Sequence, residues 1–232
     1  MTYLGQVFGA EADAPDGGNA VFQPYPAEYD AGIAALMAAF PAEGEPVDLE
    51  TPIEIRGATV VATNFAGNFE IPGSQSRFWL ADGAGTVEVR MDFNDVEGLP
   101  MFPIRVGHKI DLDVTQVDQY FGAGQVTKGT NWNLVEVNQD VYIFDVDREL
   151  TEADLNQVVR VTGTLEGAPE ECGPDQKCWN SFNYGHGVGI LRTKSDFAEP
   201  GKCLTFVGPM RLFQGTPQFD TINFTWMRIY ND

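Results

Sequence analysis

Hydrophobic and polar residues alternate with a period of two along several stretches of the chain. These stretches are residues 53–61, 77–80, 86–91, 109–117 and 132–137. Alternation over such runs indicates strands that bury one face. Gly57 interrupts the first run, as expected where a strand bends sharply at the corner of a small barrel. The pattern therefore predicts a five-stranded barrel in the first part of the chain.

Three local motifs in this region resemble a known family. They are Arg56-Gly57 in the first strand, Phe-Trp-Leu-Ala-Asp-Gly-Ala-Gly at residues 78–85, and Val-Gly-His-Lys-Ile at residues 106–110. The last two are similar to the FxLxDGxG and GDxVxVxGxV segments of exported bacterial OB domains. The resemblance implies a partly open Greek-key barrel. It also implies a bacterial envelope or secreted protein, with a possible lipid anchor on a cysteine upstream of Met1.

The second half of the chain repeats the pattern of the first. Residues 158–165 repeat the opening strand, with Gly163 in the place of Gly57. Residues 109–125 align without gaps with residues 202–218. Divergent internal repetition indicates a duplicated module. We therefore expect an all-β protein with two tandem five-stranded OB-fold-like Greek-key barrels, a short N-terminal helix and one linker helix.

The same patterns predict the domain organisation. The expected parts are an acidic N-terminal tail (1–51) with a short helix near 28–40, a first barrel (52–140), a linker (141–154) and a second barrel (155–232). Residues 1–27 are rich in Gly, Ala, Asp and Pro, which is typical either of a flexible tether or of an arm whose aromatic residues lie on the first barrel. Thr151 followed by Asp154 resembles a capping box and predicts a helix start in the linker.

The charge is strongly unbalanced, with 34 acidic residues against 14 Lys and Arg and a formal net charge of −20. A field of this sign repels phosphate, so nucleic acid is not expected as a partner. Residues 1–51 contain no Lys or Arg, whereas the second barrel is close to neutral. Its only predicted basic patch consists of Arg192, Lys194, Lys202 and Arg211.

The three cysteines leave several interpretations open. Cys172 and Cys178 bracket a turn-forming Gly-Pro-Asp-Gln-Lys insert, which suits a small disulfide loop and an oxidising compartment. Two reduced thiols are an alternative. A metal site with His186 and Cys203 is another, although the Cys-x5-Cys spacing departs from that of zinc knuckles. Cys203 falls at an inward strand position, where a free cysteine acts as a small apolar group.

Motifs for catalysis are missing from the sequence. The chain has two histidines and no nucleophile in an elbow context, so a catalytic triad has no support. The glycines of residues 185–189 lie between predicted strands, not in the strand-to-helix turn of a dinucleotide site. No Walker motif occurs. We therefore expect a non-enzymatic protein without a cofactor or a metal ion.

These features favour an extracytoplasmic binding or scaffold protein that contacts protein or carbohydrate through rigid aromatic side chains. The alternative is a single-stranded nucleic-acid-binding protein, in which bases stack on aromatic residues. No apolar run is long enough to span a membrane. The candidate ligand-binding residues are Trp79, Tyr120, Phe121, Gln125 and Trp132 in the first barrel and Trp179, Tyr184 and Phe213 in the second.

The predicted cysteine bridge can be tested by counting thiols. Titration of the denatured, unreduced chain with a thiol reagent should detect one reactive thiol, that of Cys203, because the other two would be oxidised. Three thiols before reduction would contradict the predicted bridge between Cys172 and Cys178.

Overall fold

The computed structural model describes residues 20–42, 45–64, 75–92, 100–102, 104–120, 122–170, 178–193, 198–220 and 227–230. The protein is all-β, with one short α-helix and one short 3-10 helix in these ranges. The elements up to the linker are β1 (Ala20–Val21), α2 (Ile33–Met37), β2 (Val47–Asn64), β3 (Gln75–Asp82), β4 (Gly85–Asp92), β5 (Lys109–Tyr120) and β6 (Ala123–Glu136). The remaining elements are β7 (Val141–Tyr142), β8 (Phe144–Asp145), η2 (Glu152–Asp154), β9 (Val158–Glu170), β10 (Cys178–Asn183), β11 (Val188–Thr193), β12 (Cys203–Phe213), β13 (Thr216–Asp220) and β14 (Met227–Tyr230).

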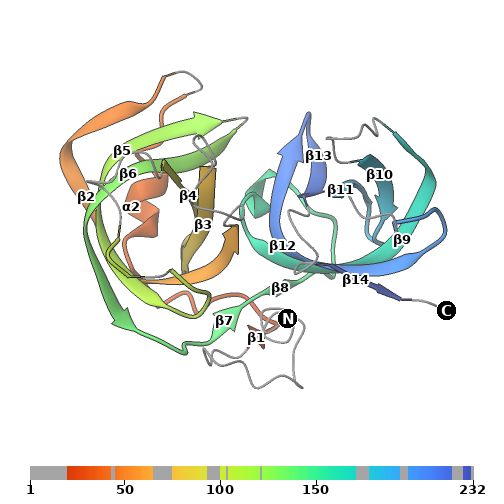
Figure 1. Ribbon diagram of the computed structural model, residues 1–232, viewed down its shortest axis with the longest axis horizontal. Helices are drawn as coiled ribbons and strands as arrows, with labels where there is room; N and C mark the ends of the chain where they lie inside the picture. The colour runs from red at the N-terminus through yellow and green to blue at the C-terminus, as the bar shows by residue number, and fades with distance from the viewer. Residues whose placement is uncertain are drawn as a thin grey trace.

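The first half forms a closed barrel with the strand order β2-β3-β4-β6-β5. Neighbouring strands are antiparallel except β4 and β6, which pair in parallel with Glu88 opposite Gln125. The inward side chains, including Ile55, Phe78 and Leu112, form one buried core. Figure 1 shows this barrel beside a second one.

The second half repeats this topology. β9 pairs with both β10 and β12, and β11 pairs in parallel with β13 at Ile190 and Gln218. β14 adds to β12, and β8 adds to β9. The parallel pair lies between the same two antiparallel hairpins as in the first barrel, so the predicted fold class of two tandem OB-like barrels is confirmed.

The predicted internal repeat holds at the level of single residues. Gly122 and Gly215, which the alignment pairs, lie in the turns after β5 and β12 with φ angles of 79° and 80°. Gln125 and Gln218 are also paired by the alignment, and both are buried on the parallel strand that completes the barrel.

Two predicted boundaries differ from the structure. Most of the segment between the predicted strands 109–117 and 132–137 is itself strand, because β6 begins directly after the turn at Gly122 and pairs with β5 along its length. The predicted helix 28–40 shortens to α2, which begins after Gly32 in a left-handed conformation with φ 97°.

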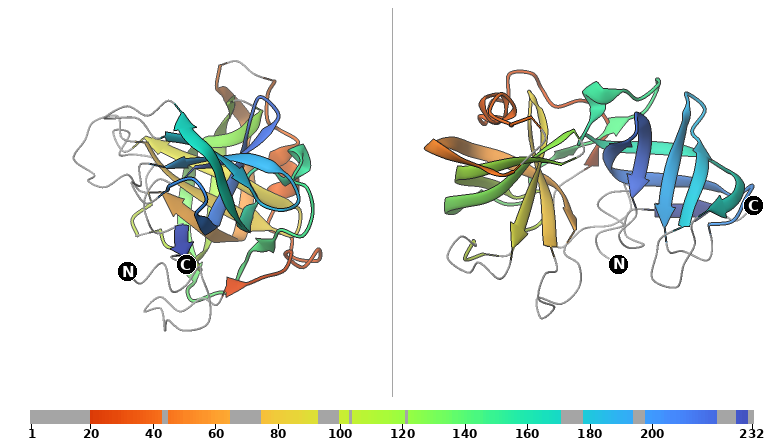
Figure 2. Two further views of the ribbon diagram at one scale, coloured as in Figure 1. Left: turned by 90° about the vertical axis from the view of Figure 1, so that its right-hand side faces the viewer. Right: turned by 90° about the horizontal axis from the view of Figure 1, so that it is seen from above.

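The part of the N-terminal tail that the structure describes is not a free tether. α2 places Ile33 and Leu36, both fully buried, in the core of the first barrel. The carboxylate of Asp82 accepts hydrogen bonds from the backbone N–H groups of Ala31 and Ile33 at 2.8 and 3.0 Å. The right-hand view of Figure 2 shows α2 against the end of the barrel. Residues 20–42 therefore belong to the folded unit.

The predicted capping box at Thr151 and Asp154 is confirmed at the start of η2. The Asp154 side chain is only 1% exposed and accepts hydrogen bonds from both terminal nitrogens of Arg148 at 2.6 and 2.8 Å. Burial alone would raise the pKa of this carboxyl. The hydrogen bonds from Arg148 and Thr151 outweigh burial, so the pKa of Asp154 lies below its ordinary value.

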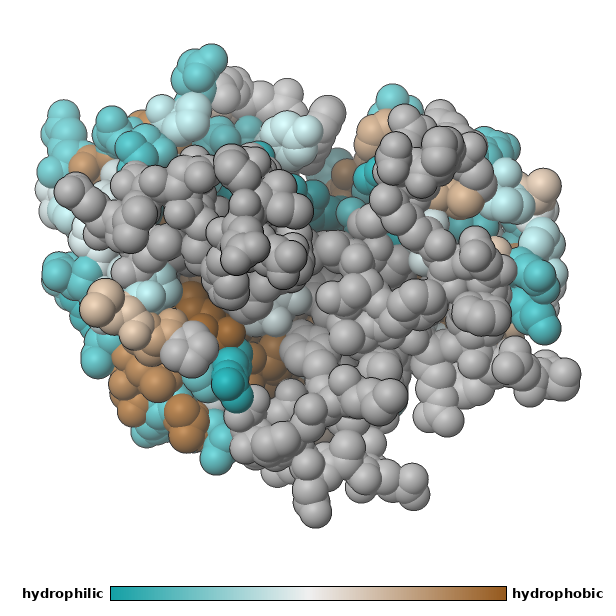
Figure 3. All heavy atoms as spheres, viewed as in Figure 1, coloured by the Kyte–Doolittle hydropathy of each residue, from teal (hydrophilic) through white to brown (hydrophobic). Residues whose placement is uncertain are grey.

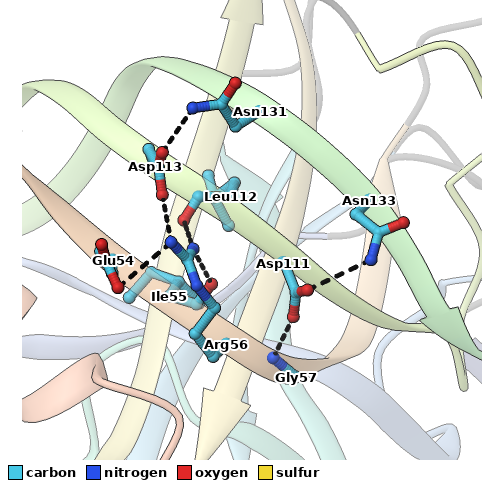
Figure 4. A network of polar contacts seen from close by, with 9 residues as sticks. All are labelled: Glu54, Ile55, Arg56, Gly57, Asp111, Leu112, Asp113, Asn131 and Asn133. Carbon is cyan, nitrogen blue, oxygen red and sulfur yellow. Dashed lines mark hydrogen bonds and ion pairs between the residues drawn. The ribbon is translucent and has the colours of Figure 1, made fainter.

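A polar network holds the bend of β2 against β5 and β6 (Figure 4). Asp111 accepts hydrogen bonds from the backbone N–H of Gly57 at 2.7 Å and from Asn133 at 3.2 Å. One residue earlier on β2, Arg56 pairs with Asp113 at 2.7 Å. These contacts fix the bulge at which the long strand changes direction.

Alanine substitutions at Gly57 and Gly163 should destabilise the two barrels for different reasons. Gly57 has a φ of 73° with open space around it, so Ala costs only backbone strain of about 1–2 kcal/mol. At Gly163 an added Cβ would lie 2.2 Å from the carbonyl oxygen of Asn183, which forces the strands apart. Urea unfolding should show the larger loss for Gly163→Ala. Asn should be tolerated better than Ala at position 57 only, because Asn adopts the left-handed conformation more readily.

The Asp154→Asn variant should lose stability in a pH-dependent way. The folded-state pKa of Asp154 is depressed, so its contribution is present above the unfolded pKa of about 4 and is lost as pH falls through the folded value. At pH 7 the free energy of unfolding should drop by about 1.5–3 kcal/mol, the range for hydrogen bonds to charged groups. Chemical denaturation from pH 7 to pH 2 should show this difference shrinking, and a constant difference would contradict the assignment.

Candidate functional site

OB barrels usually bind ligands on the outer face of their second and third strands, which here are β3 and β4 in the first barrel. Phe78 and Val89 point into the core. Side chains alternate along strands, so Arg77, Glu88 and Arg90 lie on the outer face. Arg77 and Arg90 are directly opposite each other in the antiparallel pair.

The corresponding face of the second barrel presents Trp179 on β10 and Arg192 on β11, which are also directly opposite each other. The Arg192 guanidinium lies 5.3 Å from the centre of the Trp179 ring, a cation–π distance. The ring of Phe213, at the end of β12, meets Trp179 edge-on at 4.9 Å between centroids. Three strands thus bring two aromatic rings and one cation together.

The first barrel has an equivalent set. Glu88 pairs with Gln125 in the first barrel, and Ile190 pairs with Gln218 in the second. The internal repeat makes the two glutamines equivalent, so Glu88 and Ile190 are equivalent as well. Arg90 and Arg192, which lie two residues further along these strands, therefore occupy equivalent positions. Tyr120 is equivalent to Phe213 at the end of its strand, and the guanidinium of Arg90 lies 6.0 Å from the centre of its ring. Each barrel therefore carries an arginine beside aromatic side chains at the same place in the fold.

The two outer faces meet at a buried carboxylate. Glu88 is fully buried and accepts a hydrogen bond from Gln125 at 3.1 Å. It pairs with Arg77 of its own barrel at 3.4 Å and also with Arg211 on β12 of the second barrel. Apolar residues of both barrels, including Trp79 and Phe219, belong to one continuous core cluster. Figure 1 shows β3 and β4 on the side of the first barrel nearest the second.

We call this region the seam. It comprises Arg77, Glu88, Arg90 and Tyr120 from the first barrel and Trp179, Arg192, Arg211, Phe213 and Asp220 from the second.

Positive charge is concentrated in the seam, where four arginines face two acids. Burial lowers the pKa of Arg77, and the nearby cations Arg211 and Arg90 lower it further, while Glu88 and Asp220 act in the opposite direction. Asp220 lies 4.0 Å from Arg192. The interactions of Arg77 therefore connect the two barrels, and the seam is a local basic region in a chain whose net charge is −20. Figure 3 shows one face of the molecule, on which the coloured surface is largely hydrophilic, with an apolar area low on the first barrel.

Three of the sequence-predicted ligand-binding residues lie in the seam, namely Tyr120, Trp179 and Phe213. The Tyr120 side chain is 47% exposed. Trp179 and Phe213 are partly buried against each other. Trp179 and Phe213 contact each other in the second barrel, and Tyr120 lies beside Arg90 at the equivalent strand end of the first barrel.

Three of the other predicted positions do not fit a binding role. Trp79, Gln125 and Tyr184 are buried, so these predictions are corrected: the three side chains pack inside the protein. Trp132 packs edge-on against Phe78 of the first core and donates from its indole to a backbone carbonyl. Phe121 lies outside the described residues.

The predicted basic patch is only partly assembled. Arg192 and Arg211 both lie in the seam. Lys202 precedes the first residue of β12, whereas Arg211 lies near its end, so the two are separated by almost the whole strand. Lys194 lies outside the described residues. Sequence reasoning missed Arg77, Glu88 and Arg90 because the loops between the first three strands differ in length, which breaks the constant alignment offset there.

The cysteine and histidine positions do not form a metal site in the part of the chain that the structure describes, where no group of three or more potential ligands occurs. Cys203 is a partly buried free thiol. Cys178 begins β10 and Cys172 lies outside the described residues, so their pairing stays a prediction. Within the same ranges, no helix is long and apolar enough to cross a membrane.

Comparison with known proteins identifies similar folds but no family. No protein-family model matches the sequence, and no curated protein does. Among solved structures, p202 HIN1 in complex with a 12-mer double-stranded DNA shares 14% identity over 81% of this chain and 96% of that chain, with a TM-score of 0.38. Fission yeast Pot1 with single-stranded DNA shares 8% identity over 84% and 86%, with a TM-score of 0.37. A replication protein A heterotrimer bound to single-stranded DNA shares 17% identity over 82% and 51%, with a TM-score of 0.35.

These findings correct the expectations about the partner and the location. They also limit the resemblance to a known family to its fold. The three structures just described contain bound DNA, so the expectation that nucleic acid is an unlikely partner is corrected and not carried further. The expected extracytoplasmic location and the lipid anchor are likewise not carried further. The resemblance to exported bacterial OB domains extends to the OB fold alone.

Proposed function

We propose that the protein is a non-enzymatic, single-stranded nucleic-acid-binding protein whose contact surface consists of the two arginine–aromatic sets of the seam. The observation that carries the proposal is the repeated placement of an arginine beside aromatic side chains. Arg90 with Tyr120, and Arg192 with Trp179 and Phe213, occupy equivalent positions on the two barrels.

Aromatic and cationic groups in this arrangement suit a single strand for a physical reason. Every unpaired base has an exposed π-face that can stack on Trp, Tyr or Phe, with little dependence on sequence. A guanidinium beside the ring can contact the phosphate that follows the stacked base. Bases inside a duplex are already stacked on one another, so they cannot use these rings without being unpaired. The seam therefore favours single strands over double strands.

The net charge of −20 does not oppose contact at the seam itself. Charges more than about 10 Å away are largely screened at 0.1 M salt, so a local group of arginines acts at short range. The surrounding acids still weaken the long-range attraction of phosphate. We therefore expect binding of moderate strength that depends on the salt concentration. Stacking should contribute a larger share of the binding free energy than it does in a strongly basic protein.

Binding should be measured by fluorescence anisotropy of a labelled oligothymidine at low ionic strength, with the duplex as comparison. We expect Trp179→Ala to weaken binding about tenfold or more, because one stacked base is worth about 1–3 kcal/mol. Arg192→Gln should weaken it and reduce the slope of log K against log salt by about 0.7, the value for one phosphate contact on a single strand.

Arg56→Gln is the matched control. It removes the same charge, but Arg56 contacts only β2 and β5 in the network of Figure 4. Its affinity should equal that of the unmodified protein. Absence of oligonucleotide binding by the unmodified protein at low salt, or equal weakening by Arg56→Gln and Arg192→Gln, would overturn the proposed function.

A further inference from the structure

Glu88 is a residue of the seam that forms ion pairs with arginines of both barrels. Its carboxylate has no exposed surface. One oxygen lies 3.4 Å from Arg77 and 3.1 Å from the amide nitrogen of Gln125, both of the first barrel. The other oxygen pairs with Arg211 of the second barrel.

Two arginines on opposite sides of the interface would repel each other without this carboxylate. The charge of Arg211 is close enough to lower the pKa of Arg77. A charge removed from water is stable only while it is paired, and removal of one partner leaves the others desolvated and uncompensated. The negative charge of Glu88 therefore stabilises the relative position of the two outer faces, together with the continuous apolar cluster beneath them.

We infer that Glu88 is a positioning residue that makes the two arginine–aromatic sets one binding site. This inference rests on the proposed function. With Glu88 in place, a strand long enough to reach both sets binds as if to a single surface. Without it, the sets remain intact, but the two arginines that it pairs repel each other and shift the sets relative to one another, so a long strand loses part of the advantage of simultaneous contact.

The direction in which neutralisation of Glu88 changes the affinity for oligonucleotides distinguishes a positioning role from a simple charge effect. If Glu88 acted only as a negative charge near the phosphates, its neutralisation would strengthen binding of every oligonucleotide. If it positions the two sets, neutralisation weakens binding of long strands and leaves the binding of short strands nearly unchanged. The ratio of the two affinities is therefore the informative quantity.

The experiment compares oligothymidines of about 6 and about 20 nucleotides, lengths that match one barrel and both barrels. In the unmodified protein the long strand should bind much more tightly than the short one. In Glu88→Gln the long-strand affinity should fall at least about tenfold while the short-strand affinity changes less than about twofold, because linked sites can gain several powers of ten. The matched control is Glu166→Gln, which removes one charge from an exposed carboxylate on β9 that pairs only with Asn183 among the contacts described.

A second variant covers the case in which Glu88→Gln does not fold, as judged by its thermal unfolding. Arg211→Lys keeps the charge but replaces the planar guanidinium that meets Glu88, so it should reduce the same length dependence. An unchanged ratio of long-strand to short-strand affinity in the folded variants would overturn the role of Glu88 while leaving the proposed function standing. Failure of the unmodified protein to bind either strand would instead refute the proposed function.

Discussion

The parallel pairing of two strands in each barrel is the constraint on which the rest of the structure depends. β4 with β6, and β11 with β13, complete their barrels and fix which residues lie on the outer face. Because the pairing is in the same register in both copies, Arg90 and Arg192 are carried to equivalent places beside aromatic residues. The same strands bring Glu88 to the point where the barrels meet, so barrel closure, the seam and the contact between the barrels have a common geometric origin.

Much of the fold could be predicted from the sequence, since alternation and the repeat around residues 109–125 and 202–218 reflect burial on one face of a strand. The bend at Gly57 and the capping box at Thr151 also followed from local chemistry. The extent of β6 could not be predicted, because Gly124, Lys128 and Gly129 break the alternation of its first half, while pairing with β5 decides its conformation. Tertiary context overrode a weak local preference there.

The candidate site was predicted less well, for a different reason. Aromatic residues on strands look alike in sequence whether they face inward or outward, so Trp79 and Trp179 could not be separated, although one is buried and the other lies in the seam. The arginines of β3 and β4 are scattered in the acidic half of the chain and become a group only when the second barrel is placed against them. Net charge therefore did not reveal this local group of arginines, because electrostatic recognition depends on where charges gather.

The docking of α2 has a consequence for how the protein can be divided. Ile33 and Leu36 fill the interior of the first barrel, and the carboxylate of Asp82 binds the backbone just before and at the first turn of the helix. A fragment cut at the expected domain boundary near residue 52 would lack this plug and expose a hydrophobic opening to water. An autonomous first barrel must therefore include the chain from before Ala31 onwards. A segment about twenty residues before the first alternating strand thus contributes to the interior of that barrel.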